Sequence, residues 1–475
     1  MGPVAAIPSR GRRSRLAAAR GSWRNPLGGW LIPRLLLLLV LIALAPAVAE
    51  LRFPPPEFES GHTMPDTIVP PPRATAMEYV DVAVLLLALG VASHLSLVKR
   101  SRKGLAALSV FSVLYFGFYR EGCVCAIGSI QNVALAAFNP GYALPLTVGV
   151  FFLAPIVVAL FFGRAFCAGV CPHGAIQDLM LLKPVKVPLW LEQGLGVLPF
   201  IYLGAGVLFA ATGSAFIICR ADPFIPIFRL AGPTTMVVLG IAFLVLAMFV
   251  GRPYCRFMCP YGAVLRMASM VSKWYVRISP AHCSRCRICE EVCPYGAIRH
   301  PSPNPEPAIV AGDRRRLIGL AILLPVLMVL GGWMGSRLVI PWSRMDANVV
   351  LAEELLAPQR APLPAGAATP ESLALGRAEA NAGDLLTAAS RTRQHYAWGG
   401  WLFGGWMGLV VGAKLTGVSL RSERKDYEPD RGACLSCGRC FKFCPHEKVR
   451  RAGVPALIKP IPAPMTAISA APQSD

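Results

Sequence analysis

Two cysteine runs with the same spacing constrain this chain more than any other feature. Residues 283–294 and 434–445 both read C-x2-C-x2-C-x3-C-P. About 140 residues lie between the two runs, and much of that interval is apolar. A fold for this chain has to explain why the spacing occurs twice and why apolar segments separate the copies.

The spacing is that of bacterial ferredoxins, in which the fourth cysteine of each run binds the cluster formed by the other run. We therefore predict two [4Fe–4S] clusters. A zinc site is the main alternative, and the repetition of the complete run with both prolines argues against it. One cluster is predicted to take Cys283, Cys286, Cys289 and Cys444, and the other Cys434, Cys437, Cys440 and Cys293.

The composition indicates an integral membrane protein. Hydrophobic residues make up 55% of the 475 residues, and only 15% are charged. The formal net charge of +21 suits either nucleic-acid binding or positively charged loops on one side of a membrane. The long apolar runs favour the membrane, so we expect contact with the lipid bilayer and none with nucleic acid.

The apolar runs predict an α-helical protein with about seven membrane spans after an N-terminal segment. A bilayer core of about 30 Å needs about 20 apolar residues. Before them, an arginine-rich stretch and the run "LLLLLVLIALAPAVAE" predict a cleaved signal peptide or an anchor. The predicted spans are residues 79–97, 104–119 (short), 142–163, 195–218, 232–251, 317–340 and 396–416.

The distribution of Lys and Arg predicts the orientation, because both residues favour cytoplasmic loops. With the N-terminus inside, the cytoplasmic segments hold 35 of the 47 Lys and Arg residues. Two spans separate the two cysteine runs, so both runs fall on the cytoplasmic side and can meet there. We therefore predict one split ferredoxin unit on the cytoplasmic face of a bacterial inner-membrane protein.

The resulting organisation alternates membrane segments with cysteine-bearing ones. The predicted parts are a signal peptide or anchor (1–49), a periplasmic Pro-rich loop (50–78), a transmembrane core (79–270), the first ferredoxin motif (271–316), a span (317–340), a periplasmic insertion (341–395), a span (396–416), and the second ferredoxin motif with the tail (417–475).

An internal repeat adds a second group of cysteines. "GRAFCAGVCPHGAIQD" (163–178) and "GRPYCRFMCPYGAVLR" (251–266) each follow a span and carry C-x3-C-P. We predict that four thiolates gather at one membrane face, either as a further metal centre or as two redox-active pairs. Thiolates favour iron–sulfur, zinc or Cu(I); simple packing of small residues is the alternative. The four residues are Cys167, Cys171, Cys255 and Cys259.

The arginines that open the repeats, Arg164 and Arg252, suit two roles. They can contact lipid headgroups or tune the potential of a cluster. The sequence favours the headgroup contact, because both residues stand at predicted membrane boundaries.

Three further cysteines, Cys123, Cys125 and Cys219, fall at the predicted outer face, upstream of the two repeats. We interpret them as a copper or iron–sulfur ligand set, or as a disulfide-forming site.

The histidines and the other motifs predict little further chemistry. No C-x-x-C-H is present, which argues against covalent haem. His173 and His446 each follow a Cys-Pro and are expected to form hydrogen bonds near a cluster. The segment "GGWLFGGWMG" (399–408) predicts close helix packing through small residues.

These motifs together resemble the NosR/NirI-type membrane polyferredoxins over about residues 79–450. The resemblance rests on the doubled C-x3-C-P, on "REGCVCAIGSIQN", and on the two ferredoxin runs. NapH, a quinol-oxidising iron–sulfur protein, is similar across the repeat and the first run. NosR carries a periplasmic flavin domain with covalent FMN. Only about thirty residues lie between the predicted signal peptide or anchor and the first span here, so we expect that domain to be absent.

The resemblance implies electron transfer between the quinone pool, or a cytoplasmic flavodoxin or ferredoxin, and a periplasmic flavoprotein or cuproenzyme. We expect an electron carrier, or an oxidoreductase subunit, in anaerobic or denitrification-type respiration. A stand-alone catalyst is not expected. Two other interpretations stay open: a copper reductase or cuproenzyme assembly factor, and a redox-sensing regulatory protein.

Overall fold

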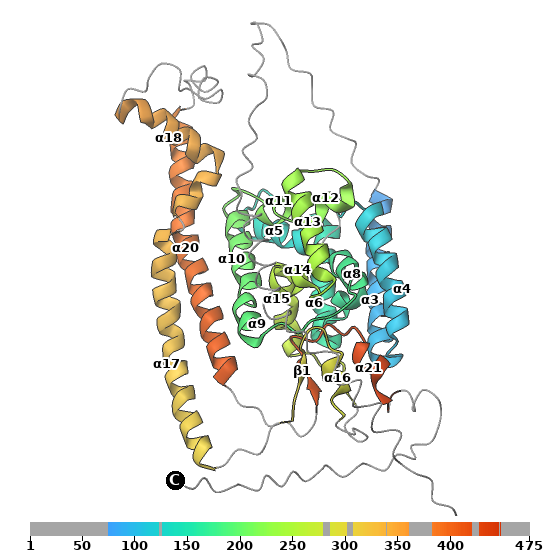
Figure 1. The fold of residues 1–475 in the computed structure, drawn as a ribbon. Helices are drawn as coiled ribbons and strands as arrows, with labels where there is room; N and C mark the ends of the chain where they lie inside the picture. Colours follow the sequence, from blue (N-terminus) through green and yellow to red (C-terminus); the bar gives the residue numbers. More distant parts are fainter. Residues whose placement is uncertain are drawn as a thin grey trace, which may run out of the picture.

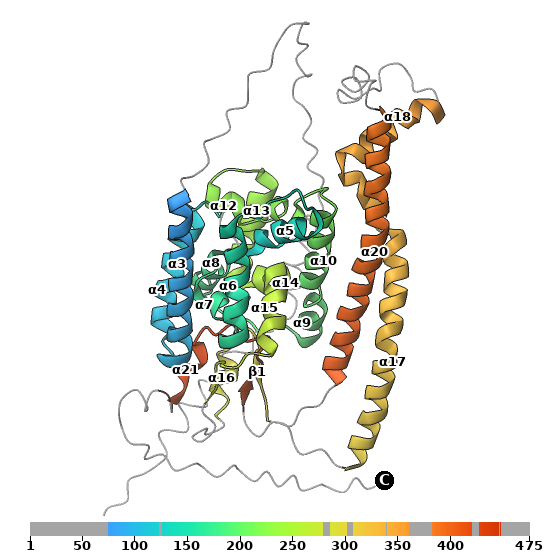
Figure 2. The ribbon, with the colours of Figure 1, turned by 180° about the vertical axis from the view of Figure 1, so that it is seen from behind.

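The computed structural model describes residues 75–122, 126–278, 286–301, 307–338, 340–360, 382–419, 427–445 and 447. Almost all of the secondary structure in this part of the chain is helical, with one sheet of two short strands. Figure 1 shows a helical bundle, a long helical hairpin beside it, and a small unit at one end of the bundle; Figure 2 shows the same arrangement from behind.

Apolar helices form the wall of the bundle. The segments Ala76–Val98 and Trp190–Ala211 are long and apolar enough to cross a membrane, as is Ile318–Arg337 of the hairpin. Three further apolar helices are shorter. The wall elements are α3 (Thr75–Ser93) with the π-helix η1 (His94–Val98), α4 (Arg102–Ser112) with the π-helix η2 (Val113–Tyr119), α5 (Ala126–Phe138), α6 (Leu146–Phe162), α9 (Leu189–Leu195), α10 (Leu198–Ala211) and α13 (Thr234–Ala247).

The two repeats form pairs of short helices that fold into the bundle. In each pair the second cysteine of C-x3-C-P is the N-cap, and the proline that follows occupies the first turn. Proline suits this position because its missing N–H would have no helical partner there. The pairs are α7 (Ala165–Gly169) with α8 (Pro172–Leu179), and α14 (Pro253–Phe257) with α15 (Pro260–Met270). Two further short helices, α11 (Ile217–Arg220) and α12 (Ile225–Arg229), lie between the repeats in the sequence.

The hairpin consists of α17 (Pro307–Leu338) and α20 (Ala382–Ser419), connected through η4 (Ile340–Met345) and α18 (Ala347–Arg360). Its helices meet through glycines: a Cβ at Gly400 would lie 2.7 Å from the carbonyl oxygen of Gly335, and one at Gly404 would overlap Gly331. The predicted close packing of residues 399–408 is therefore confirmed. α20 runs unbroken across the predicted boundary between residues 395 and 396.

The small unit is built from two segments of the chain, one before the hairpin in the sequence and one after it. It contains α16 (Ile288–Glu291), β1 (Ile298–Arg299), β2 (Glu428–Pro429) and α21 (Arg439–Phe443). The strands are antiparallel, with Ile298 opposite Pro429 and Arg299 opposite Glu428. The chain therefore leaves this unit, forms the hairpin, and returns to complete it, as Figure 1 shows.

Candidate functional site

The two ferredoxin runs meet in the small unit. Tyr295 and Ala297, just after the first run, pack with Leu435 and Cys437 from the second, and Cys293 and Cys434 border this cluster. The thiol of Cys440 interacts electrostatically with the first-run cysteines Cys289 and Cys293. The prediction that the runs come together is confirmed for the residues described. Cys283 lies outside them.

The arrangement of these thiols fits iron–sulfur clusters. Cys293 interacts electrostatically with Cys434, Cys437 and Cys440, the three cysteines whose cluster it is predicted to complete. Burial raises the pKa of the Cys434 thiol to about 12, so the thiolate needs a positive partner such as iron. Among the described residues, no three His, Cys, Asp or Glu side chains converge on a single metal ion. In a [4Fe–4S] cubane each cysteine thiolate binds a different iron, so the four ligands of a cluster do not converge on a single metal ion.

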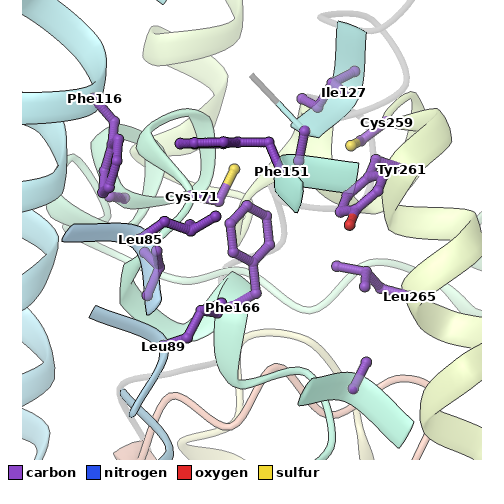
Figure 3. Close-up of a cluster of buried hydrophobic side chains, with 14 of the residues drawn as sticks. Leu85, Leu89, Phe116, Ile127, Phe151, Phe166, Cys171, Cys259, Tyr261 and Leu265 are labelled. Atoms are coloured by element: carbon purple, nitrogen blue, oxygen red, sulfur yellow. The ribbon is translucent and has the colours of Figure 1, made fainter. Parts of the chain in front are cut away.

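The four repeat cysteines lie together, but deeper than the sequence suggests. Cys171 and Cys259 are 7% and 6% exposed and belong to the main hydrophobic core, and Cys167 and Cys255 pack against it. Figure 3 shows Cys171 and Cys259 among the rings of Phe151, Phe166 and Tyr261. The short helices carry these cysteines into the core of the bundle, and their position at one membrane face stays a prediction.

Cys167 connects this group with the ferredoxin unit. It packs against the bundle core and also against the apolar cluster that contains Cys437, Cys293 and Cys434. Within the bundle, Cys167 interacts electrostatically with Cys171, Cys255 and Cys259. The thiols therefore form a continuous series from the ferredoxin unit into the middle of the bundle.

Polar groups are directed at these sulfurs. The Arg164 Nη2 atom lies 3.8 Å from the Cys167 sulfur, and the Gln177 side-chain amide donates to the Cys255 sulfur at 3.3 Å. The backbone N–H of Gly262 donates to the Cys259 sulfur at 3.3 Å. Donors of this kind stabilise thiolates and tune the potential of bound clusters.

The interpretation of Arg164 and Arg252 as lipid contacts is wrong. Their side chains are 6% and 0% exposed. Each donates to the backbone of the opposite repeat: Arg164 to the carbonyl of Gly262 at 3.4 Å, and Arg252 to the carbonyls of Cys167 and Ala168. Buried guanidinium groups need such acceptors because desolvation is costly. These arginines hold the two cysteine pairs against each other.

Asp178, at the end of the first repeat, joins the bundle to the ferredoxin unit. Its buried carboxylate lies 2.5 Å from Arg102, 3.4 Å from Arg252 and 3.3 Å from Arg439, and it accepts a hydrogen bond from Tyr295 at 3.1 Å. The three arginines hold the pKa of this carboxyl far below its usual range, against the opposing effect of burial. Arg439 and Tyr295 come from different ferredoxin runs, so one carboxylate fixes both.

His173 forms a second buried polar pair. Its Nε2 atom lies 3.0 Å from the Oδ2 atom of Asp222, and the two side chains are 0% and 2% exposed. Asp222 also accepts from the backbone N–H of Phe224 at 2.8 Å. The expected hydrogen bonding of His173 beside its Cys-Pro is thus observed, although its partner is a carboxylate. His446 lies outside the described residues.

The opposite end of the bundle contains a cavity of about 340 Å³ lined by Cys219 and Asp222, with charged residues including Glu78 and Arg229. The Gln131 amide nitrogen lies 3.5 Å from the Cys219 sulfur. The Tyr202 hydroxyl, which donates to the Ile218 carbonyl at 3.4 Å, interacts electrostatically with both Cys219 and Cys259. The predicted companions Cys123 and Cys125 lie outside the described residues.

Sequence reasoning did not identify three residues of this site: Asp178, Gln177 and Asp222. Asp178 carried a usable signal, because it and Glu192 are the only acidic residues in the basic segment 164–194. One of few carboxylates in a basic segment is a candidate for a structural ion pair. No comparable signal marks Gln177, whose amide contacts depend on how the two repeats pack.

Comparison with known proteins agrees with the cysteine pattern. Residues 144–189 with 232–279, and separately residues 276–299, match families described as 4Fe-4S binding domains. NirI of Paracoccus denitrificans is 30% identical over 216 residues, which is 42% of this chain and 31% of the relative. NosR of Pseudomonas aeruginosa, named a regulatory protein, is 27% identical over 236 residues, 46% of this chain and 32% of the relative.

YccM of Escherichia coli, named for electron transport, is 24% identical over 159 residues, covering 30% of this chain and 44% of the relative. The chain thus spans less than half the length of each of these three relatives. No solved structure matches it.

Proposed function

We propose a function from the premise that this chain is a membrane polyferredoxin of the NosR/NirI type: it conducts electrons across a bacterial inner membrane. In this proposal the chain crosses the membrane seven times, the ferredoxin unit faces the cytoplasm, and the cavity at Cys219 lies on the periplasmic side. The name of YccM supports a setting in electron transport, and the resemblance to the NosR/NirI type implies denitrification-type respiration.

Two [4Fe–4S] clusters occupy the ferredoxin unit. The first is held by Cys283, Cys286, Cys289 and Cys444, and the second by Cys434, Cys437, Cys440 and Cys293. When bound, such clusters accept and release single electrons. A third thiolate centre, iron–sulfur or copper, is held by Cys167, Cys171, Cys255 and Cys259; the family match over residues 144–189 and 232–279 supports iron–sulfur.

The position of Cys167 carries this proposal. It packs against both the ferredoxin unit and the bundle core, so the membrane thickness of about 30 Å is divided into shorter steps. The buried arginines near this junction favour added negative charge and therefore favour reduced clusters. Quinol, or a flavodoxin or ferredoxin, supplies electrons, and a periplasmic flavoprotein or cuproenzyme accepts them through the Cys219 cavity.

Oriented vesicles test the conduit. Quinol or flavodoxin reduces the protein on the cytoplasmic side, and an impermeant acceptor such as ferricyanide reoxidises it on the other. We expect Cys167→Ser to slow outward transfer by at least about 10-fold while the ferredoxin unit keeps about eight irons per chain. Ser269→Ala, a change of a buried hydroxyl outside the thiol series, serves as the control. Wild-type transfer by Cys167→Ser would exclude the route.

Copper handling through the predicted outer cysteines is the second candidate; Cys219 lines a cavity with the carboxylates Glu78 and Asp222, which do not by themselves converge on a metal ion. Copper stoichiometric with the protein, lost in Cys219→Ser while iron is unchanged, would favour this function. If that variant keeps its copper, or if the wild-type protein binds none, the conduit remains the better proposal.

A further inference from the structure

A small cationic cavity lies where the bundle meets the ferredoxin unit. It has a volume of about 40 Å³, and its lining includes Arg164, Arg256, Arg266, Glu192 and Cys255. Glu192 is the only carboxylate among the lining residues, so the wall carries an excess of positive charge. Neither the ferredoxin ligands nor the buried thiols explain this excess.

Two of these arginines are engaged by the protein. Arg256 pairs with Glu192 at 2.6 Å and donates to the carbonyl of Tyr295 at 2.8 Å. Arg164 donates to the carbonyls of Gly432 and Gly262. Their geometry is therefore fixed without any further ligand.

Arg266 differs from its neighbours. Although partly buried, its guanidinium forms no hydrogen bond or close ion pair with any residue in the described part of the chain. Burial lowers the pKa of Arg266, and the like charges of Arg164 and Arg299 lower it further, whereas the carboxylates of Asp430 and Glu192 act in the opposite direction without forming a close ion pair. Lys414 brings another cation nearby, since a Cβ at Gly196 of the cavity wall would lie 2.7 Å from its Nζ atom, which also donates to the carbonyl of Gln193. An anion would satisfy these charges.

Two exposed tryptophans lie close in the sequence to residues that line the cavity. Trp190, at the start of the apolar segment Trp190–Ala211, is 69% exposed, and Trp274, just after α15, is 49% exposed. Exposed tryptophans are typical of this interface. Basic pockets between membrane helices on the cytoplasmic side bind acidic lipid headgroups.

We propose that this cavity binds the phosphate group of an acidic phospholipid from the cytoplasmic leaflet, with Arg266 as its principal ligand. The volume admits only a few non-hydrogen atoms, so the phosphate enters and the rest of the lipid stays outside. Free inorganic phosphate presents the same chemistry and is the other source. The site ties the junction between bundle and ferredoxin unit to the membrane surface.

The test uses the full chain in nanodiscs of phosphatidylcholine, with or without phosphatidylglycerol, followed by native mass spectrometry of retained lipid. Radiolabelled inorganic phosphate is titrated in parallel. We expect one retained phosphatidylglycerol per chain, with at least about 10-fold weaker retention in Arg266→Gln, because charge-assisted hydrogen bonds are lost. Arg277→Gln, which removes an exposed arginine outside the cavity, should behave as wild type.

Three outcomes decide the proposal. Phosphate binding without lipid retention, weakened in Arg266→Gln, keeps the site but assigns it to the free anion. Retention of neither, or equal retention in Arg266→Gln and wild type, overturns it. Iron content monitors folding of each variant, and Arg266→Lys should restore part of the binding because it keeps the charge. Vesicle electron transfer is measured separately, so failure here does not bear on the conduit.

Discussion

The two C-x3-C-P repeats share one backbone design and differ in their side-chain chemistry. Both begin with a buried arginine that donates to the opposite repeat, and both start a helix at Cys-Pro. They diverge where the first copy has His173 and Asp178 and the second has Tyr261 and Arg266. The shared part holds the thiols, and the divergent part decides what each copy attaches to.

The divergence separates two duties. The first copy makes its contacts through carboxylates. Asp178 contacts the ferredoxin unit, and His173 pairs with Asp222, which lines the cavity at Cys219. The second copy donates its Tyr261 hydroxyl to the carbonyl of Phe152 at 2.7 Å, and its Arg266 lines the cationic cavity. A symmetric thiol core can therefore serve an asymmetric membrane protein.

The largest effect is expected for Asp178→Asn, which removes the negative charge from beneath three arginines. Arg252 has no solvent exposure, so it would be left as an uncompensated buried cation. We expect a loss of about 3–5 kcal/mol in the free energy of unfolding. Denaturation of the detergent-solubilised protein, followed by tryptophan fluorescence, measures it. Asp430→Asn, which removes a partly exposed partner of Arg299, is the control and should cost at most about 1 kcal/mol.

Low pH should remove the stabilisation that the negative charge of Asp178 provides. The folded-state pKa of Asp178 is depressed below the unfolded value of about 3.9. Its stabilisation is therefore complete at neutral pH and is lost as pH falls below about 4. The difference in unfolding free energy between wild type and Asp178→Asn should shrink over that range. A difference that stays constant down to pH 3 would show that the cost comes from packing and not from charge.

An intermediate effect is expected for His173→Phe. Phenylalanine can keep the ring contacts with Phe224 and Phe228, but it removes the partner of the buried Asp222 carboxylate. Hydrogen bonds to charged groups are worth about 1.5–3 kcal/mol, and we expect a cost in that range. The same denaturation assay measures it. His173→Phe combined with Asp222→Leu should recover part of the loss, and a double variant worse than the single one would contradict this account.

Much of this architecture follows from local patterns. The apolar helices, the meeting of the two ferredoxin runs and the glycine packing of the hairpin could be predicted because each depends on spacing or chain direction. The Asp178 network could not, because its arginines lie 76 and 261 residues away and at the opposite repeat. The burial of Arg164 and Arg252 was misjudged for the same reason: position along the chain indicates a membrane boundary, but only tertiary packing determines what covers a side chain.

The smallest effect is expected for Tyr261→Phe. The change removes a hydroxyl that is buried in the bundle and donates to the Phe152 carbonyl on α6, while the ring packing against Phe166 and Phe152 is kept. A neutral hydrogen bond of this kind contributes about 1 kcal/mol. The denaturation assay should therefore rank Asp178→Asn, His173→Phe and Tyr261→Phe in decreasing cost. If Tyr261→Phe proves as damaging as His173→Phe, the second repeat is anchored as strongly as the first, and the division of duties between the two copies is wrong.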